Sequence, residues 1–364
     1  MLRIYRINKK RVRIQLKKLL NMKKLCVCGS FGFGKESLNG QTIKTEIVTK
    51  YYQNTFGVNE VQTIDTQGVM NFLIMPIKLF FAYFLCKNII ILPAHNSIRV
   101  LAPLCRLYQI LTGKKTHYFV IGGWLPHYLP KHKLVFWGIR SFYGVYAETN
   151  TMKSALERFG LENVYVLPNC KYLDIEKVEN KIYVPFPPLK LCTFSRINRK
   201  KGIGDAVTVI DEINKEKGNT VVVLDIFGRV DSGEQAWFED LKNTFPESVK
   251  FKGAIPYEKS VFTLRNYHAL LFPTRYFTEG IPGTIIDAYA AGLPVIASRW
   301  ESCEDIVFSR KTGFVYEFEN PSAMKDTILE IIKNYDCLVS MRDTCLKVAY
   351  EYLPENVLNK IKLK

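Results

Sequence analysis

The sequence predicts an α/β fold in which doubly wound parallel sheets form two domains. Short apolar runs alternate with helical patterns along most of the chain, which is typical of βαβ units and parallel sheets. The chain has 364 residues, of which 48% are hydrophobic, enough for two domains that each have their own core. Residues 185–188, Pro-Phe-Pro-Pro, offer no continuous run of N–H donors and predict a stiff linker near the middle of the chain.

We expect four segments along the chain. They are a basic leader (1–21), an N-terminal Rossmann-like domain (22–185), a C-terminal Rossmann-like domain (186–345) and a helical tail (346–364). Strands are predicted at 24–29, 88–93, 117–121 and 144–148, and then at 189–194, 221–228, 249–253, 269–274 and 294–297. Helices are predicted at about 41–52 and at 203–213. This order of elements gives each domain an alternating β/α pattern.

The most informative segment begins at Glu279 and predicts a loop, a short helix and a buried strand. Three residues break regular structure in the loop: Gly280, Pro282 and Gly283. Thr284 is then expected to be the N-cap, Gly292 to end the helix, and residues 294–297 to form a parallel strand covered on both faces. A glycine-flanked helix N-terminus directs unpaired N–H groups at a ligand, which favours a diphosphate.

Two carboxylates of this segment are spaced to bind one ligand. Glu279 lies in the predicted loop and Asp287, eight positions later, lies about one turn inside the predicted helix. Both can therefore accept hydrogen bonds from the hydroxyls of a ligand that sits above the helix N-terminus. A sugar nucleotide has hydroxyls at both ends and a diphosphate between them, so it fits this arrangement.

A second motif carries the cations that such a ligand needs. Arg196 and Lys201 follow the predicted strand 189–194 and precede the predicted helix 203–213. Two cations beside a strand-to-helix turn stabilise a diphosphate, and they stabilise it more as charge builds on a leaving group. Two neighbouring cations, Arg199 and Lys200, are expected to form a solvated basic turn.

Both motifs resemble those of retaining glycosyltransferases of family 4, also called glycosyl transferase group 1. The segment from Glu279 resembles the E-x(7)-E signature, with Asp287 where the family usually has Glu. The segment from Ser195 through Lys201 and the following glycine resembles G-R-L-x-x-x-K-G, with Ser195 replacing the first glycine. The resemblance implies a GT-B fold, in which two Rossmann-like domains face each other across a cleft. It also implies a C-terminal helix that crosses back to the N-terminal domain.

The resemblance implies roles for individual residues. The catalytic candidates are Glu279, Arg196 and Lys201. The donor-binding candidates are Gly40, Gly253, Gly280, Gly283, Thr284, Ile285 and Asp287. The acceptor-side candidates, in the N-terminal domain, are Gly123, Trp124 and His127. Many relatives carry a histidine that assists catalysis on the loop after the strand at 117–121. This loop departs from that pattern, so His127 and His95 are only weak candidates for a catalytic histidine.

The implied activity is transfer of a sugar, with retention, from a nucleotide-diphosphate sugar to a hydroxyl of a lipid-linked or polysaccharide intermediate. Such a reaction serves cell-surface polysaccharides such as capsule or lipopolysaccharide. No D-x-D motif occurs in the sequence, and the protein's cations can take the charge role of a metal, so no metal and no cofactor are expected. Two alternatives stay open: a GT-B sugar-nucleotide epimerase, and a non-enzymatic basic protein that binds membrane or nucleic acid. No nucleic-acid motif is evident, so nucleic acid is not expected as a partner.

The charge is concentrated at the start of the chain. The net charge is +17, and residues 1–24 contain ten Lys or Arg and no acid. This leader is either an arm for anionic lipid, at roughly 1 kcal/mol per cation near the surface, or an extension ahead of a true start at Met22. A peripheral contact with an anionic membrane is therefore one expectation from the sequence.

Cysteine usage and hydropathy indicate the cellular compartment of the protein and its relation to the membrane. Nine cysteines are scattered without a CxxC pair, which indicates reduced thiols and a cytoplasmic protein, with the inner face of the cell membrane as a further setting. Residues 69–92 are rich in Leu, Ile and Phe, but interrupting Pro and Lys residues divide them into a helix and a strand rather than a membrane span. The helix is expected either in the core or at a bilayer surface.

Overall fold

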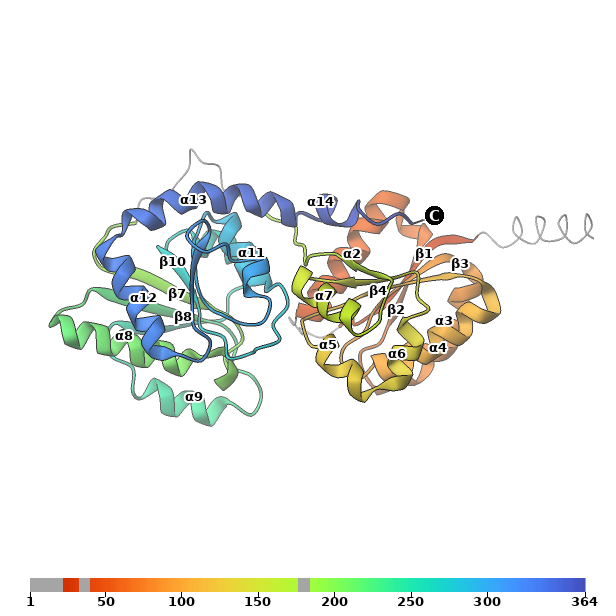
Figure 1. The fold of residues 1–364 in the computed structure, drawn as a ribbon, viewed down its shortest axis with the longest axis horizontal. Coiled ribbons are helices and arrows are strands. Elements are labelled where there is room, and N and C mark those ends of the chain that lie inside the picture. Colours follow the sequence, from red (N-terminus) through yellow and green to blue (C-terminus); the bar gives the residue numbers. More distant parts are fainter. Residues whose placement is uncertain (1–21, 33–39, 176–183, 364) are drawn as a thin grey trace, which may run out of the picture. The chain divides into compact units, whose positions relative to one another are not determined.

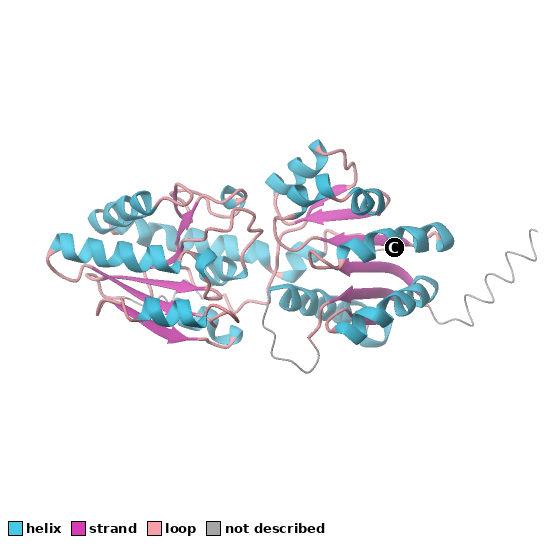
Figure 2. Ribbon diagram, turned by 90° about the horizontal axis from the view of Figure 1, so that it is seen from below, coloured by secondary structure: helices cyan, strands magenta, loops and turns pink. Residues whose placement is uncertain are grey.

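The computed structural model describes residues 22–32, 40–175 and 184–363. These residues divide into two compact units. Of the described residues, those within 22–148, 152–167 and 358–363 form the N-terminal unit, and those within 149–151 and 168–357 form the C-terminal unit. The basic leader (1–21) falls outside the described residues, whereas the expected linker at 185–188 lies within them. Figure 2 shows the same alternation of strands and helices in both units.

The N-terminal unit is a parallel sheet with helices on both faces. Its strands are β1 (Lys23–Gly29), β2 (Val61–Asp65), β3 (Cys86–Leu92), β4 (Lys115–Phe119), β5 (Gly144–Ala147) and β6 (Val164–Val166), in the order β2-β1-β3-β4-β5-β6. Its helices are α2 (Gly40–Phe56), α3 (Val69–Leu85), α4 (Ile98–Thr112), α5 (Leu125–Tyr128), α6 (Lys133–Ile139) and α7 (Asn150–Arg158). Right-handed crossovers put α2 on one face and α3, α4 and α6 on the other (Figure 1).

The centre of this sheet is continuously apolar, as a strand between two helical layers must be. Ile89, Ile90 and Ile91 of β3 are each fully buried, since alternate residues point to opposite covered faces. Residues 69–92 divide into α3 and β3, as the sequence predicts. Among the described residues, no helix is both long enough and apolar enough to cross a membrane.

The C-terminal unit repeats this architecture. Its strands are β7 (Leu189–Phe194), β8 (Val222–Phe227), β9 (Val249–Gly253), β10 (Ala269–Phe272), β11 (Val295–Ser298) and β12 (Gly313–Tyr316), all parallel, in the order β12-β11-β10-β7-β8-β9. Its helices are α8 (Ile203–Lys217), α9 (Gln235–Lys242), α10 (Ser260–Leu264), α11 (Gly283–Ala290), α12 (Pro321–Lys333), α13 (Asp336–Ala349) and α14 (Pro354–Leu358). The prediction of two doubly wound α/β sheets is confirmed.

Helix α11 starts two residues earlier than the sequence predicts. Pro282, not Thr284, is the N-cap: Pro282 is extended, and its carbonyl accepts from Ile285 N–H at 3.1 Å. The end of the helix agrees with the prediction, because Gly292 adopts φ +61°. Gly292 N–H bonds Tyr289 O at 2.9 Å and Leu293 N–H bonds Ala288 O at 2.8 Å, the two hydrogen bonds of a Schellman motif.

The end of the chain groups with the N-terminal unit. Residues from Leu358 onwards belong to it, and the Tyr51 hydroxyl of α2 donates a hydrogen bond to Asn359 Oδ1. Pro354 starts α14, which matches the predicted break in the tail. A terminal segment that returns to the N-terminal unit is the arrangement that the family resemblance implies.

Candidate functional site

The strand order of the C-terminal unit determines where its ligand site is expected. From β7 the chain continues to β8 and β9 on one side, and it then crosses to β10 on the other side. The point between β7 and β10 is therefore a topological switch, the position at which open α/β sheets generally bind their ligands. The loop after β7 carries Arg196 and Lys201, and the loop after β10 carries Glu279.

At this switch point, Lys201 and Glu279 form an ion pair. Lys201 Nζ donates to Glu279 Oε1, and the Thr274 hydroxyl donates to the same oxygen at 3.2 Å. The two side chains are 13% and 18% exposed, so their attraction is less screened than at the surface while both groups stay accessible to a ligand. Lys201 Nζ also lies 4.9 Å from the centre of the Tyr276 ring, which favours a cation there.

The glycine after Lys201 brings the two loops into contact. Gly202 adopts φ +68°, and a Cβ atom there would lie 1.8 Å from the Pro273 carbonyl oxygen at the end of β10. Only glycine permits this approach. Arg275 N–H donates to Lys200 O at 2.8 Å, which ties the loops together a second time.

Arg196 has a different partner. Its Nη1 lies 3.2 Å from Asp231 Oδ2, and the same oxygen accepts from Asn198 Nδ2 at 2.7 Å. The Arg196 side chain is 55% exposed, so this pair is a weak surface interaction that a phosphate could replace. Lys200 is exposed, as the sequence analysis expects for the basic turn.

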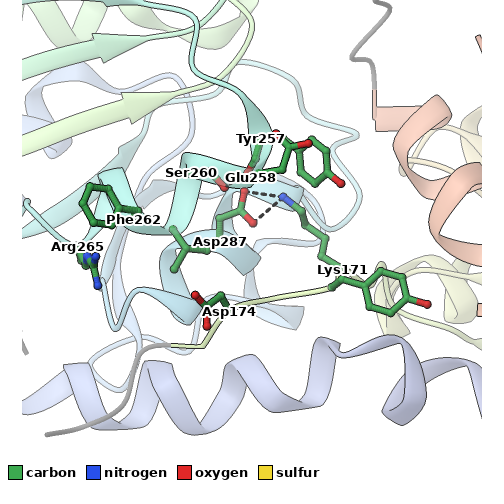
Figure 3. Close-up of a pocket in the computed structure, with 10 residues that line it drawn as sticks. Lys171, Asp174, Tyr257, Glu258, Ser260, Phe262, Arg265 and Asp287 are labelled. Carbon is green, nitrogen blue, oxygen red and sulfur yellow. Dashed lines mark hydrogen bonds and ion pairs between the residues drawn. The ribbon is translucent and has the colours of Figure 1, made fainter. Parts of the chain in front are cut away.

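Asp287 forms an ion pair with Lys171, which the sequence does not predict. Lys171 Nζ lies 2.6 Å from both carboxylate oxygens, and the two residues are almost fully buried (Figure 3). Burial raises the pKa of the Asp287 carboxyl above its ordinary value, and the Lys171 ammonium opposes that rise. Each oxygen keeps lone-pair capacity for a further donor.

A pocket of about 240 Å³ lies beside this pair. Its lining is mixed, with charged and aromatic side chains: Lys171, Tyr172, Asp174, Tyr257, Glu258, Ser260, Val261, Phe262, Arg265 and Asp287. Figure 3 shows the Lys171 side chain reaching across to Asp287 on α11. Nearby, Asn169 Nδ2 donates to Ile281 O at 3.1 Å and so fixes the loop before α11. The sequence offers no signal for Lys171 as the partner of this motif.

The remaining donor-binding candidates lie in several elements. Gly253 ends β9 with φ +77° and open space around its Cβ position, and Gly40 begins α2 with open space as well. Gly280 precedes α11 in a buried position, and a Cβ at Gly283 would lie 3.5 Å from Lys171 Cδ. Two further candidates are on α11: Thr284, whose buried Oγ1 has no hydrogen-bond partner, and Ile285, which is fully buried.

The acceptor-side candidates follow β4 in the N-terminal unit. Gly123 is buried, Trp124 is half-buried with its indole N–H bonded to Ile121 O at 2.7 Å, and His127 is exposed on α5. The structure brings His95 to this group, since its ring centre lies 4.9 Å from that of Trp124 and 4.5 Å from that of Tyr128. The exposed His95 ring beside the half-buried Trp124 ring suits contact with a sugar, although the sequence alone does not join the two residues.

Comparison with known proteins identifies relatives of part of the chain. Residues 174–351 match the sequence model of a family described as glycosyl transferases group 1. An uncharacterized glycosyltransferase of Methanocaldococcus jannaschii is 23% identical over 172 residues, which cover 44% of this chain and 42% of the relative. The amylovoran biosynthesis glycosyltransferase AmsK of Erwinia amylovora is 22% identical over 148 residues, which cover 40% of this chain and 36% of the relative. The matched part is thus less than half of each curated relative.

Solved structures resemble almost the whole chain in fold. Sucrose-phosphate synthase from Thermosynechococcus elongatus aligns with a TM-score of 0.73 at 14% identity, over 93% of this chain and 97% of that one. HepE of Anabaena in complex with UDP aligns with a TM-score of 0.69 at 14% identity, over the same 93% and 97%. At this identity the likeness establishes the GT-B fold, and the fold alone.

Proposed function

We propose that the protein is a retaining glycosyltransferase, from the premise that residues 174–351 match the sequence model of the glycosyl transferases of group 1. Its donor is a nucleotide-diphosphate sugar, and its acceptor is a hydroxyl of a lipid-linked or polysaccharide intermediate of the cell surface. The observation that carries the proposal is the meeting of Lys201 and Glu279 at the switch point between β7 and β10. The names of the relatives support the substrate class, since AmsK is a glycosyltransferase of amylovoran biosynthesis.

In the proposed mechanism, protein cations stabilise the leaving group. As the bond from the sugar to the diphosphate breaks, negative charge grows on the departing oxygen and the sugar gains oxocarbenium character. Lys201 meets this charge from the loop after β7, and Arg196 exchanges Asp231 for a phosphate oxygen. The first N–H groups of α11 add a partial positive charge. These groups bind the transition state more tightly than the ground state, which raises turnover.

The two carboxylates orient the donor. Glu279 turns from Lys201 toward the hydroxyls of the sugar, because the diphosphate competes for the ammonium. Asp287 accepts from the ribose with the lone pairs that Lys171 leaves available. The pocket beside this pair is about 240 Å³, room for part of a nucleoside.

We also propose that the reaction needs no metal, where in the cell it takes place and which residues bind the acceptor. The cations supply the charge stabilisation that a divalent metal supplies in other transferases, so the reaction proceeds without a metal. The protein works in the cytoplasm and reaches a lipid-linked acceptor at the inner face of the membrane. The acceptor-side candidates Gly123, Trp124 and His127 bind the acceptor sugar.

A thermal-shift screen against a panel of sugar nucleotides tests the proposal. A ligand at about 100 times its dissociation constant adds about 2.7 kcal/mol of stability, so one donor should stand out. Product analysis then follows with the selected donor, with and without a lipid-linked oligosaccharide extract. Transfer only in the presence of the extract supports the proposal. An altered sugar nucleotide from donor alone would show an epimerase, and no response to any sugar nucleotide would reject a donor site.

A further inference from the structure

One face of α3 exposes apolar side chains along its whole length. Consecutive helical residues are about 100° apart, so residues spaced by three or four share a face. The buried residues of the helix are Met75, Leu79, Ala82 and Tyr83. On the opposite side lie its exposed apolar residues: Val69, Met70, Leu73, Ile74, Ile77, Phe81 and Phe84. A surface helix needs one apolar face to pack against the core. Helix α3 has that face and a second apolar face that is exposed.

The neighbouring helices extend this exposed surface. Tyr108 of α4 joins the helices, since its ring centre lies 5.4 Å from that of Phe80 and its hydroxyl donates to Pro76 O at 3.3 Å. The exposed apolar residues of α4 and α6 are Leu107, Ile110, Leu111, Leu134 and Trp137. Figure 1 shows α3, α4 and α6 together on one face of the N-terminal sheet. We call these apolar residues of the three helices the α3 surface.

Exposed cations lie on the helices of the α3 surface, and this part of the sequence contains no acid. No Asp or Glu occurs between Asp65 and Glu148, whereas these residues include nine Lys or Arg. Lys78 lies exposed on α3, and Lys133 lies exposed at the start of α6. In the sheet, Lys23 of β1 lies beside Cys86 of β3, and Lys115 of β4 lies beside Asn88 of β3. These lysines are therefore near the amino end of β3, where α3 ends.

We propose that the α3 surface docks on a lipid bilayer that contains anionic lipids. Apolar side chains on a helix face enter the boundary between headgroups and acyl chains, and flanking lysines reach the phosphates with their long stems along the apolar surface. Each such cation adds to the attraction by an anionic leaflet. A second copy of the chain is a poor occupant, because it would bring like charges together. The proposal deepens the proposed function, since it assigns the membrane contact to specific helices.

Vesicle flotation of the full-length protein tests the docking surface. Vesicles of equal parts phosphatidylcholine and phosphatidylglycerol should carry the parent protein, and pure phosphatidylcholine should carry much less. Ile77→Glu combined with Phe81→Glu places two charges in the apolar layer, because these side chains are 61% and 55% exposed on the face. The pair should weaken binding to mixed vesicles about a hundredfold or more.

A matched pair in the C-terminal unit controls for charge. Val339→Glu with Tyr350→Glu adds the same charge at positions that are 49% and 54% exposed, and it should leave binding within about threefold of the parent. Ile77→Gln with Phe81→Gln should also lose binding, since it removes apolar surface without adding charge. Donor-induced thermal shifts should stay unchanged in all variants, which separates this proposal from the proposed function.

Three outcomes would overturn the proposal. The first is a parent protein that does not float with mixed vesicles. The second is an Ile77→Glu/Phe81→Glu variant that floats like the parent, which would assign binding to other cations. The third is a concentration-dependent dimer of the parent, seen by sedimentation velocity, that the same variant disperses; the occupant would then be a second copy of the chain.

Discussion

Lys171 Nζ lies 2.6 Å from both carboxylate oxygens of Asp287, and burial removes the pair almost completely from solvent. Taking two charges out of water is costly, and only their mutual attraction and hydrogen bonds offset the cost. The pair is therefore sensitive to the loss of one partner. It also fixes the acidic side chain that we propose to bind the ribose.

Removal of Lys171 alone should destabilise the C-terminal unit. Lys171→Met leaves a buried carboxylate unpaired, at an expected cost of about 3–5 kcal/mol in chemical denaturation. Lys171→Met combined with Asp287→Leu should recover most of this stability but not the affinity for the donor. Arg310→Met, which breaks the exposed pair with Glu330 at 2.9 Å, should cost less than about 1 kcal/mol. Equal costs at both sites would show that the buried pair has no special role.

The proposed diphosphate clamp, by which we mean Arg196 and Lys201, should be evident as rate losses in steady-state kinetics with saturating acceptor. Arg196→Ala and Lys201→Ala should each lower kcat about a hundredfold, or about 3 kcal/mol of transition-state stabilisation. Arg196→Lys should restore only part of the rate, because the guanidinium fork is lost. Lys200→Ala is the control, since Lys200 is exposed beside Lys201. Near-parent rates for both alanine variants would reject the clamp, and an equal loss at Lys200 would indicate general basicity.

Gly202 should not tolerate a side chain. In Gly202→Ala the new Cβ meets the Pro273 carbonyl and the residue must hold φ +68°, so the unit should lose at least about 2 kcal/mol of stability. Donor affinity should fall as well, because the loops after β7 and β10 separate. Gly204→Ala lies two residues further on in α8, with nothing within 4 Å of its Cβ, and should stabilise by about 0.5–1 kcal/mol. Calorimetry of the two variants distinguishes a steric effect from a general loss of flexibility.

His117 should make the N-terminal unit sensitive to acid. Burial in β4, together with Lys115, lowers the pKa of His117 to about 4. The unfolded chain binds this proton at about 6.5, so between these values the folded unit holds fewer protons and stability falls as the pH falls. The loss by pH 4 should reach about 3 kcal/mol.

Denaturation between about pH 7 and pH 4 measures this dependence, and the slope is the readout. His117→Gln should show a smaller loss toward acid, whatever its stability at neutral pH. His127→Gln, at an exposed position of α5, should keep the parent slope. Parallel curves for the parent and His117→Gln would contradict the assignment of acid sensitivity to this side chain.

Metal removal should leave transfer almost unchanged. The proposed mechanism assigns leaving-group stabilisation to Arg196, Lys201 and the first N–H groups of α11. Activity should therefore survive EDTA with little loss, and a metal-dependent transferase in the same buffer confirms that chelation is complete. An absolute requirement for Mg or Mn would remove the protein-cation mechanism.

Local patterns predicted the fold well because they depend on neighbours in the sequence. The bounds of β7 and β9 agree with the prediction to the residue, and the glycine that ends α11 has the expected conformation. The N-cap prediction at Thr284 was wrong, because an extended Pro282 can cap the helix through its backbone alone. A sequence pattern indicates side-chain caps, but it does not indicate a cap formed by the backbone alone.

Contacts across long sequence separations were not predictable. Lys171 and Asp287 are 116 positions apart, and nothing near Lys171 marks it as the partner of a motif carboxylate. Arg196 was expected beside the diphosphate, whereas its bond to Asp231 depends on how the loop after β8 folds back. The exposed face of α3 was also ambiguous in sequence, because an apolar helix residue reads the same in a core and on a surface.

The contact between Gly202 and Pro273 has a consequence for engineering donor choice. The loops after β7 and β10 share a backbone contact, a backbone hydrogen bond and the Lys201–Glu279 pair. The conformation of each loop therefore depends on the other. A loop grafted singly from a relative would meet a partner shaped for another sequence. Residues 195–202 and 273–282 form one transplantable cassette, and chimeras designed to change the sugar must exchange both halves in a single step.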